Sequence, residues 1–326
     1  MRSPFLLSPA GKDYLWGGER LKTEFHKEIS LSPLAETWEC SVHPDGKSIV
    51  ASGEHKGKTL ADVLHDHPEY LGTHPKQNTF PILVKLIDAA RDLSVQVHPD
   101  DDYAYTHEKG QLGKTEFWYV LSTPEEGGEI VYGFRDAVTM EEVEKSAGDG
   151  SIVKYLQRVP VEPGDVFFVR AGTVHAICAG TIVAEIQENS NLTYRLYDYD
   201  RTDASGKKRE LHIKKAIEVL DNTVMPSPRQ PMRVLKYRPG YASEFLARCR
   251  YFQVDRLLIN TGKERPVPIE SSSLSFLVFL CIDGVCTLSP QDGEPLSCRK
   301  GDCIFVPASP CWFRITGKAE FLRIHC

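Results

Sequence analysis

Short apolar runs, separated by Gly, Pro, Asp and Ser, dominate the hydrophobic pattern of this 326-residue chain. The runs are rich in β-branched and aromatic residues, which favour β-strands. The runs that we expect to form strands span residues 80–89, 93–99, 116–122, 166–172, 181–187 and 276–284. Many short strands bounded by turn residues predict a β-sandwich or a β-barrel.

Three segments have a helical pattern instead. The first, residues 58–72, has near its start a threonine, Thr59, that could cap a helix, and ends at a glycine. The second, residues 139–147, places Thr139 and Glu142 at the spacing of a capping box. The third, residues 210–222, gathers its apolar residues on one helical face. We therefore expect a mainly β protein with a few added helices.

A Gly-Asp motif occurs twice, as "GDVFFVRAGTVHAI" (164–177) and as "GDCIFVPASPCWFRI" (301–315). The proline-rich stretch 225–240 lies between the two copies and has no periodic pattern, so we interpret it as a connector. Strands joined at a Gly-Asp turn recur in double-stranded β-helix barrels. We predict two tandem barrels of this cupin or jelly-roll type, formed by residues 1–232, which include the helices, and residues 233–326.

The composition and charge of the chain limit the kinds of binding partner that we expect. The net charge is -6 and no Lys/Arg-rich block is present, so we expect no nucleic-acid partner. No apolar run approaches the ~18 residues of a membrane span, and we expect no membrane partner. The N-terminus lacks the pattern of a secretory signal, and the nine cysteines include no CxxC pair. These features predict reduced thiols and a cytoplasmic location.

Candidate metal ligands lie on three predicted strands. Gln96 and His98 alternate with valines in "DLSVQVHPDD" and therefore share one strand face, together with Ser94. Polar side chains inside a barrel are costly unless they are satisfied, and a bound metal would satisfy them. Glu116 belongs to the next strand, and the Gly-Asp turn places His175 on a later one. Two histidines, one carboxylate and one amide oxygen predict a site for a divalent metal.

The second barrel lacks these ligand types. Aligned without a gap, the two motifs place Trp312 where the first barrel has His175, and matching the preceding strands places Ser275 at Glu116. No histidine occurs from residue 213 to 324. We therefore expect one metal ion per chain and a second barrel filled by the Trp312 ring.

The cysteines of the second barrel do not change this expectation. Cys281 and Cys286 stand five residues apart, which places them on opposite faces of a regular strand. Cys303 and Cys311 have no companion pair at zinc-knuckle spacing.

Two cations extend the candidate site. Lys114 is two residues from Glu116 and shares its face if the strand begins there. Arg195, in "AEIQENSNLTYRLYDYDR", has two interpretations: a surface ion-pair patch with its charged neighbours, or a guanidinium that faces the metal pocket and stabilises an anion. Two cations beside a metal would suit a sugar phosphate or an enediolate.

The segments "LSVQVHPDD", "GKTEFWYVL", "GDVFFVRAGTVHAI", "AEIQENSNLTYRLYDYDR", "AETWECSVHPDG" and "YLWGG" together resemble the type I mannose-6-phosphate isomerases, especially their short bacterial form. The resemblance spans nearly the whole chain. It implies a two-cupin zinc enzyme that interconverts mannose 6-phosphate and fructose 6-phosphate, as a monomer or a homodimer.

The resemblance also implies residue roles. The positions that match the zinc ligands of the family are Gln96, His98, Glu116 and His175. Those that match other active-site residues are the cations Lys114 and Arg195, the phosphate-side Ser94 and the carboxylate Glu185. Longer relatives continue from the arginine into a Gly-Leu-Thr-Pro-like run, where this chain has "RLYDYDR", so the phosphate contacts cannot be carried over in full.

The implied reaction moves a proton between C2 and C1 through a cis-enediolate and needs a base within hydrogen-bond reach. Glu185 is the candidate base, with His98 or a metal-bound water as alternatives. Two other functions stay open on residue types alone. Two histidines and a carboxylate on a cupin also form the ligand triad of non-haem iron oxygenases, and a cupin can bind a sugar without turning it over.

Overall fold

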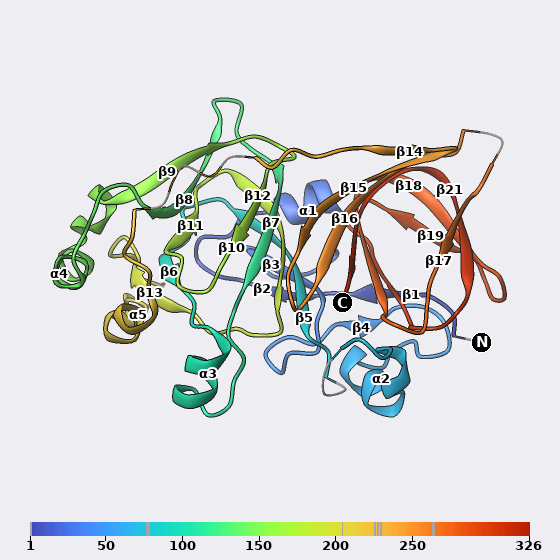
Figure 1. The fold of residues 1–326 in the computed structure, drawn as a ribbon, viewed down its shortest axis with the longest axis horizontal. Helices are drawn as coiled ribbons and strands as arrows, with labels where there is room; N and C mark the ends of the chain where they lie inside the picture. Colours follow the sequence, from blue (N-terminus) through green and yellow to red (C-terminus); the bar gives the residue numbers. More distant parts are fainter. Residues whose placement is uncertain are drawn as a thin grey trace.

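The computed structural model describes residues 2–326 apart from 76–78, 204, 225, 227, 229, 263 and 264. Two β-barrels lie side by side in this part of the chain, with short helices at their periphery (Figure 1). The mainly β architecture predicted from the hydrophobic pattern is thereby confirmed. None of the helices in the described ranges has the length and apolar character that crossing a membrane would require.

Two antiparallel sheets form the first barrel. The six-stranded sheet has the order β10 (Val166–Val169), β7 (Glu116–Ser122), β12 (Thr181–Glu188), β5 (Ile82–Ala89), β3 (Glu36–Cys40) and β2 (Ala10–Lys12). The five-stranded sheet has the order β13 (Tyr194–Tyr197), β6 (Val95–Val97), β11 (His175–Ile177), β8 (Gly128–Phe134) and β9 (Leu156–Val161). Apolar residues of both sheets, including Trp118, Ile130 and Phe167, pack into one buried cluster between them.

A single large sheet forms the second barrel. Its path runs through β14 (Lys236–Arg238), β15 (Tyr241–Arg248), β16 (Gln253–Asn260), β21 (Trp312–His325), β18 (Leu277–Pro290), β20 (Cys303–Val306), β1 (Phe5–Ser8) and β4 (Ile49–Val50). Two further strands, β17 (Val267–Glu270) and β19 (Leu296–Arg299), pair with β21 and β18. Two strands from the first fifty residues thus extend the C-terminal sheet; the proposed division at residue 232 stays a prediction.

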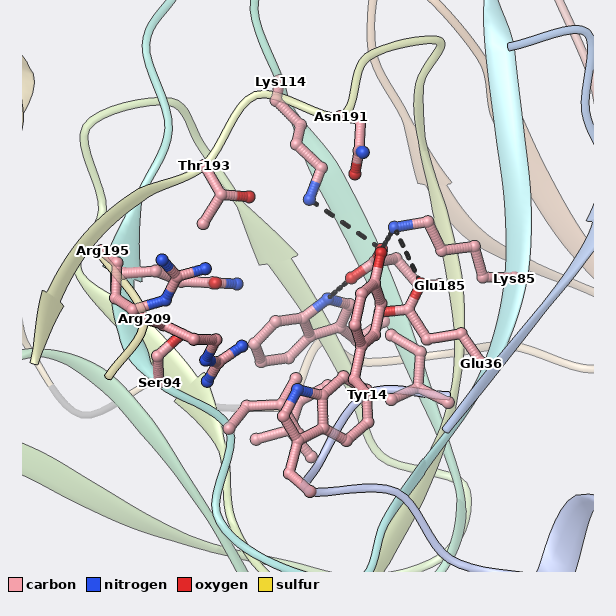
Figure 2. A pocket seen from close by; sticks show the side chains of 16 residues that line it. Tyr14, Glu36, Lys85, Ser94, Lys114, Glu185, Asn191, Thr193, Arg195 and Arg209 are labelled. Carbon is pink, nitrogen blue, oxygen red and sulfur yellow. Dashed lines mark hydrogen bonds and ion pairs between the residues drawn. The ribbon is translucent and has the colours of Figure 1, made fainter. Parts of the chain in front are cut away.

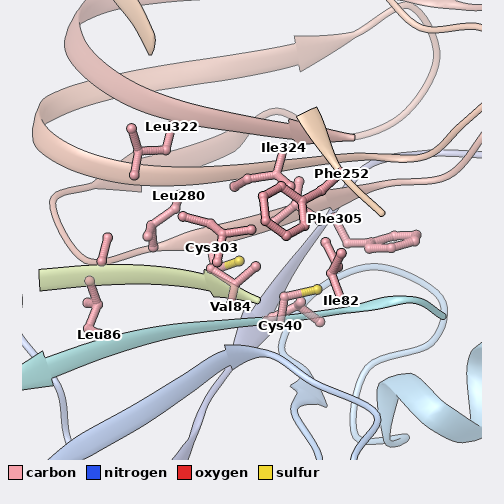
Figure 3. Close-up of a cluster of buried hydrophobic side chains, with 14 of the residues drawn as sticks. Cys40, Ile82, Val84, Leu86, Phe252, Leu280, Cys303, Phe305, Leu322 and Ile324 are labelled. Atoms are coloured by element: carbon pink, nitrogen blue, oxygen red, sulfur yellow. The ribbon is translucent and has the colours of Figure 1, made fainter. Parts of the chain in front are cut away.

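The two barrels share a buried apolar interface (Figure 3). Ile82, Val84 and Leu86 of β5 face Leu280 of β18 and Phe305 of β20 across it. Burial of this surface removes apolar area from water and holds the barrels together. The six-stranded sheet therefore has one face toward its own barrel core and the other toward the second barrel.

In the described part of the chain, five α-helices and two 3₁₀ turns pack against the barrels. They are α1 (Arg20–Phe25), α2 (Leu60–Asp66), α3 (Asp101–His107), α4 (Met140–Asp149), α5 (Ile213–Val219), η1 (Pro68–Tyr70) and η3 (Ser151–Lys154). The expected capping box of α4 is present, because Thr139 and Glu142 each bond the other's backbone. Thr59 accepts a hydrogen bond from Asp62 N and caps α2, as expected. The first predicted helix is shorter than expected, since α2 ends before Pro68.

The proposed connector falls partly outside the described residues, at 225, 227 and 229. Its C-terminal part is not a connector: β14 pairs with β15 along Lys236–Arg238. The strand was missed because Pro239 and Gly240 next to it gave the whole stretch the composition of a loop.

The prediction that Trp312 fills the second barrel is wrong. Trp312 is 37% exposed, whereas Phe313 is 1% exposed and belongs to the barrel core. Neighbouring residues of a strand point to opposite faces, so the first residue of β21 points outward and the second inward. The strand pairing also places Leu277, rather than Ser275, where the first barrel has Glu116: Leu277 pairs with Val306 as Glu116 pairs with Val169.

The expectation that Cys281 and Cys286 face opposite ways is also wrong. The pairing of β18 with β21 shifts between Cys281 and Asp283, so the strand holds one extra residue there. That bulge cancels one step of the alternation, and both thiols are buried in the second barrel core.

Candidate active site

A cavity of about 220 Å³ lies in the first barrel between its two sheets (Figure 2). Five of the residues singled out from the sequence line it: Ser94, Gln96, Lys114, Glu185 and Arg195. The rest of the lining comprises Tyr14, Trp16, Glu36, Lys85, Ile87, Leu93, Trp118, Ile177, Asn191, Thr193 and Arg209. The cavity is therefore rich in charged and hydrogen-bonding groups on an otherwise apolar barrel interior.

His98, Glu116 and His175 form a completely buried group beside this cavity. Glu116 Oε1 lies 3.2 Å from His98 Nε2, and Glu116 Oε2 lies 3.6 Å from His175 Nε2. One ligand atom from each of the three residues lies within 4.8 Å of the other two. The three residues follow β6, begin β7 and begin β11, so barrel closure brings together side chains that are far apart in sequence.

The chemistry of this group suits a divalent metal. His175 Nδ1 lies 2.8 Å from Thr173 O; if it donates its proton there, the Nε2 lone pair faces Glu116. His98 Nδ1 and Glu116 Oε2 are buried and have no hydrogen-bond partner among the described residues. Burial and the Lys114 charge lower the pKa of His98 to about 3, and burial lowers that of His175. Both imidazoles are neutral at pH 7, the form that binds a metal.

The side chain of Gln96 lies beside the buried group of His98, Glu116 and His175. His175 and Gln96 are paired residues of β11 and β6, and the Gln96 amide lies 3.3 Å from His175 Nε2. A half-turn of the amide exchanges its nitrogen for its oxygen. The oxygen of Gln96 is thus within reach of an ion held by the two histidines and Glu116.

A network of buried lysines and carboxylates adjoins the group. Lys114 Nζ contacts Glu116 and lies 3.2 Å from His98 Nε2 and 4.0 Å from Glu185 Oε1. Lys85 Nζ lies 3.0 Å from Glu185 Oε1, and Trp118 Nε1 donates to Glu185 Oε2 at 2.9 Å. Burial and the nearby Glu116 charge raise the pKa of Glu185 despite the two lysines. A carboxyl group with a raised pKa is suited to proton transfer near neutral pH.

The geometry favours the pocket interpretation of Arg195 over the surface ion-pair patch. Arg195 lines the cavity and donates through Nη1 to Glu210 O at 2.7 Å. Asp198 instead pairs with Arg201 and Arg209, and Asp200 pairs with Lys208.

Sequence reasoning missed several cavity residues. Lys85 carried a usable signal, because it is a lone charge within the apolar run of residues 82–87, and a buried lysine needs a partner. Glu36 is similar, since it alternates with Trp38 along β3. Arg209 gave no sequence signal of this kind. It stands in the charged segment "GKKRE", a pattern that normally indicates a solvated loop.

Comparison with known families gives two matches. Residues 5–118 match the catalytic domain of the type I phosphomannose isomerases, and residues 242–326 match the cupin domain of mannose-6-phosphate isomerases.

Individual proteins match over the full length. The chain is 39% identical over 325 residues to the probable mannose-6-phosphate isomerase GmuF of Bacillus subtilis, covering 100% of both chains. It is 36% identical to the mannose-6-phosphate isomerase of Streptococcus mutans, covering 100% of this chain and 99% of the other. The crystal structure of the mannose 6-phosphate isomerase from Bacillus subtilis superimposes with a TM-score of 0.90 at 36% identity, with complete coverage of both chains.

Proposed function

The chain belongs to the type I phosphomannose isomerases, and from that premise we propose that its first barrel interconverts mannose 6-phosphate and fructose 6-phosphate with the aid of a bound zinc ion. It is an isomerase, as its full-length relatives are. The observation that carries the rest of the proposal is the buried group of His98, Glu116 and His175 beside a charged cavity.

The metal would be held by Gln96, His98, Glu116 and His175. Two neutral imidazoles, a carboxylate and an amide oxygen are ligands that zinc accepts. The unpartnered Glu116 Oε2 supports this assignment, since a buried polar atom without a partner is costly. When bound, such an ion supplies Lewis-acid polarisation of the substrate's carbonyl and hydroxyl oxygens. The C-terminal barrel is proposed to be structural.

The protein's own residues would move the proton and control charge. Glu185 is proposed to take the proton from C2 of mannose 6-phosphate and to return it to C1, through a cis-enediolate of the sugar. Lys85 and Trp118 hold opposite oxygens of this carboxylate and fix its orientation. Lys114 and Arg195 are proposed to stabilise the negative charge that develops on the sugar oxygens, and Ser94 to bind substrate.

The same triad of ligand types is compatible with an iron oxygenase, but full-length relatives that are isomerases favour isomerisation. The cytoplasm, where hexose phosphates are found, is the proposed location. The proposed assembly is a monomer or a homodimer.

The test is metal analysis of the purified chain followed by a coupled assay of fructose 6-phosphate formation from mannose 6-phosphate under strictly anaerobic conditions. We expect zinc and full activity without oxygen. Product formation that requires oxygen would instead support the oxygenase, and binding of mannose 6-phosphate without turnover would support a sugar-binding cupin.

A further inference from the structure

Two arginine side chains, Arg195 and Arg209, lie together on one side of the cavity (Figure 2). Arg195 comes from β13 and Arg209 from the segment that follows it. Ser94 lies on the same side in this view, whereas Lys85 and Glu185 lie on the other. The cavity thus has an arginine side and a lysine–carboxylate side.

The arginine side carries more positive charge than its neighbours neutralise. Asp198 accepts from Arg209 Nε at 2.7 Å and also pairs with Arg201. In the described ranges, Asp198 is the one carboxylate in ion-pair contact with Arg195, Arg201 or Arg209. Arg195 and Arg209 line the cavity, and the one carboxylate is shared with Arg201 outside it, so the arginine side keeps a net positive charge.

Arg195 also has unused hydrogen-bonding capacity. Its Nη1 donates to a backbone carbonyl, Glu210 O, while its Nε is buried and has no hydrogen-bond partner among the described residues. Burial, and then the charge of Arg209, lower the pKa of Arg195. Two like charges in a partly buried cavity are costly unless an anion lies between them.

On the opposite side of the cavity, carboxylates outnumber the positively charged side chains. Lys85 contacts Glu36 and Glu185, and Lys114 contacts Glu116 and lies near Glu185. Both lysines there are held in ion-pair contact with carboxylates, and Glu116 would also bind the proposed metal. Arg195, in contrast, has no carboxylate in ion-pair contact among the described residues, and this difference directs a dianion to the arginine side.

We propose that Arg209, with Arg195, binds the phosphate group of the sugar phosphate and that Arg209 sets the preference for phosphorylated over unphosphorylated sugar. The inference rests on the proposed function for the identity of the sugar. A planar guanidinium presents paired N–H donors that match phosphate oxygens. Asp198 binds Nε and the terminal nitrogen of Arg209 and thereby positions the guanidinium.

The experiment compares Arg209→Ala with Lys208→Ala. Lys208 is the adjacent residue, and its charge is paired with Asp200 at the exposed surface, so this control removes the same charge outside the cavity. Kinetics are measured with mannose 6-phosphate and with mannose, and binding of inorganic phosphate is measured by calorimetry. Thermal melting of each variant, and of Arg209→Lys, checks the fold.

For Arg209→Ala we expect kcat/KM for mannose 6-phosphate to fall about 10- to 100-fold, the scale of one hydrogen bond between charged groups. Turnover of mannose should not change, phosphate binding should be lost, and Arg209→Lys should recover part of both. Lys208→Ala should behave as wild type. An unchanged kcat/KM for mannose 6-phosphate, an equal loss on both sugars, or phosphate binding that is absent in wild type or survives in Arg209→Ala would overturn the inference.

A failure of the proposed isomerase function would give a different experimental result from a failure of the Arg209 inference. A wild-type chain that does not isomerise mannose 6-phosphate, yet binds inorganic phosphate in an Arg209-dependent way, would leave the phosphate site standing and remove the reaction.

Discussion

At the scale of single residues, Glu185 has the burial, the raised pKa and the position in the cavity that a general base needs. We expect Glu185→Gln to lower kcat by about 10²- to 10⁴-fold, because the amide keeps the shape of the carboxylate but accepts no proton. Metal content should not change, since Glu185 is not a proposed ligand. A wild-type kcat would reassign the base to His98 or to a bound water, and loss of the metal would make Glu185 part of the metal site.

Glu188 gives a second residue-scale prediction, outside the catalytic group. Burial and the Asp101 charge raise its pKa to about 8, from an ordinary value of 4.5. Between these pH values the folded chain binds a proton that the unfolded chain has released, so stability falls as pH rises through that window. The fall is at most about 1.4 kcal/mol per pH unit for one group.

Glu188→Gln should remove this slope, measured as the difference in denaturant midpoint between pH 5 and pH 8. Glu141→Gln, an exposed carboxylate on α4, is the matched control and should keep the wild-type slope. Equal slopes in the Glu188 variant and in wild type would contradict a protonated Glu188 at neutral pH.

The sequence could predict those site residues that alternate with apolar residues along a strand. Gln96 and His98 keep this alternation on β6 and directly after it, and Glu116 begins β7. Lys114 reaches the site from the loop before β7, so the expectation that the strand begins at Lys114 is wrong. Arg209 could not be predicted in this way, because its side chain reaches the cavity from a loop and loop geometry leaves no periodic trace. Lys85 is an intermediate case. A lone charge in an apolar run indicates that the side chain is buried, but not which residue it pairs with.

At the scale of elements, β21 provides the sharpest test of side-chain direction. Phe313→Ala should lower the free energy of unfolding by about 3–5 kcal/mol, because it removes a fully buried ring from the core. Trp312→Ala should cost less than about 1 kcal/mol, since the exposed ring mainly stacks with Arg314. Chemical denaturation of both variants measures the difference. A larger loss for Trp312→Ala would mean that the tryptophan, as the ungapped alignment implied, fills the barrel.

Elements with strong local signals were predictable, and those fixed by distant partners were not. The capping box of α4 and the cap of α2 follow from residues three positions apart. The bulge in β18 that brings Cys281 and Cys286 to one face depends on its pairing with β21, about forty residues away, and has no local signature.

At the scale of the whole molecule, the repeated Gly-Asp motif predicted two barrels, but not how they join. The N-terminal strand β1 pairs with β20 of the second barrel, and the six-stranded sheet packs its outer face against the same barrel. Contacts of this kind depend on packing between segments about 200 to 300 residues apart, which a single sequence does not reveal. The second barrel buttresses the sheet that carries Lys85, Glu116 and Glu185.

The central claim is that one barrel holds both the metal and the chemistry. The most direct test measures metal stoichiometry and mannose 6-phosphate turnover on reduced, dialysed protein, for wild type and for His98→Ala/His175→Ala, with circular dichroism as the check on folding. We predict one equivalent of zinc and full activity in wild type, and no metal and no activity in the folded double variant. Two equivalents in wild type with one retained in the variant, or a metal-free variant that remains active, would contradict the account.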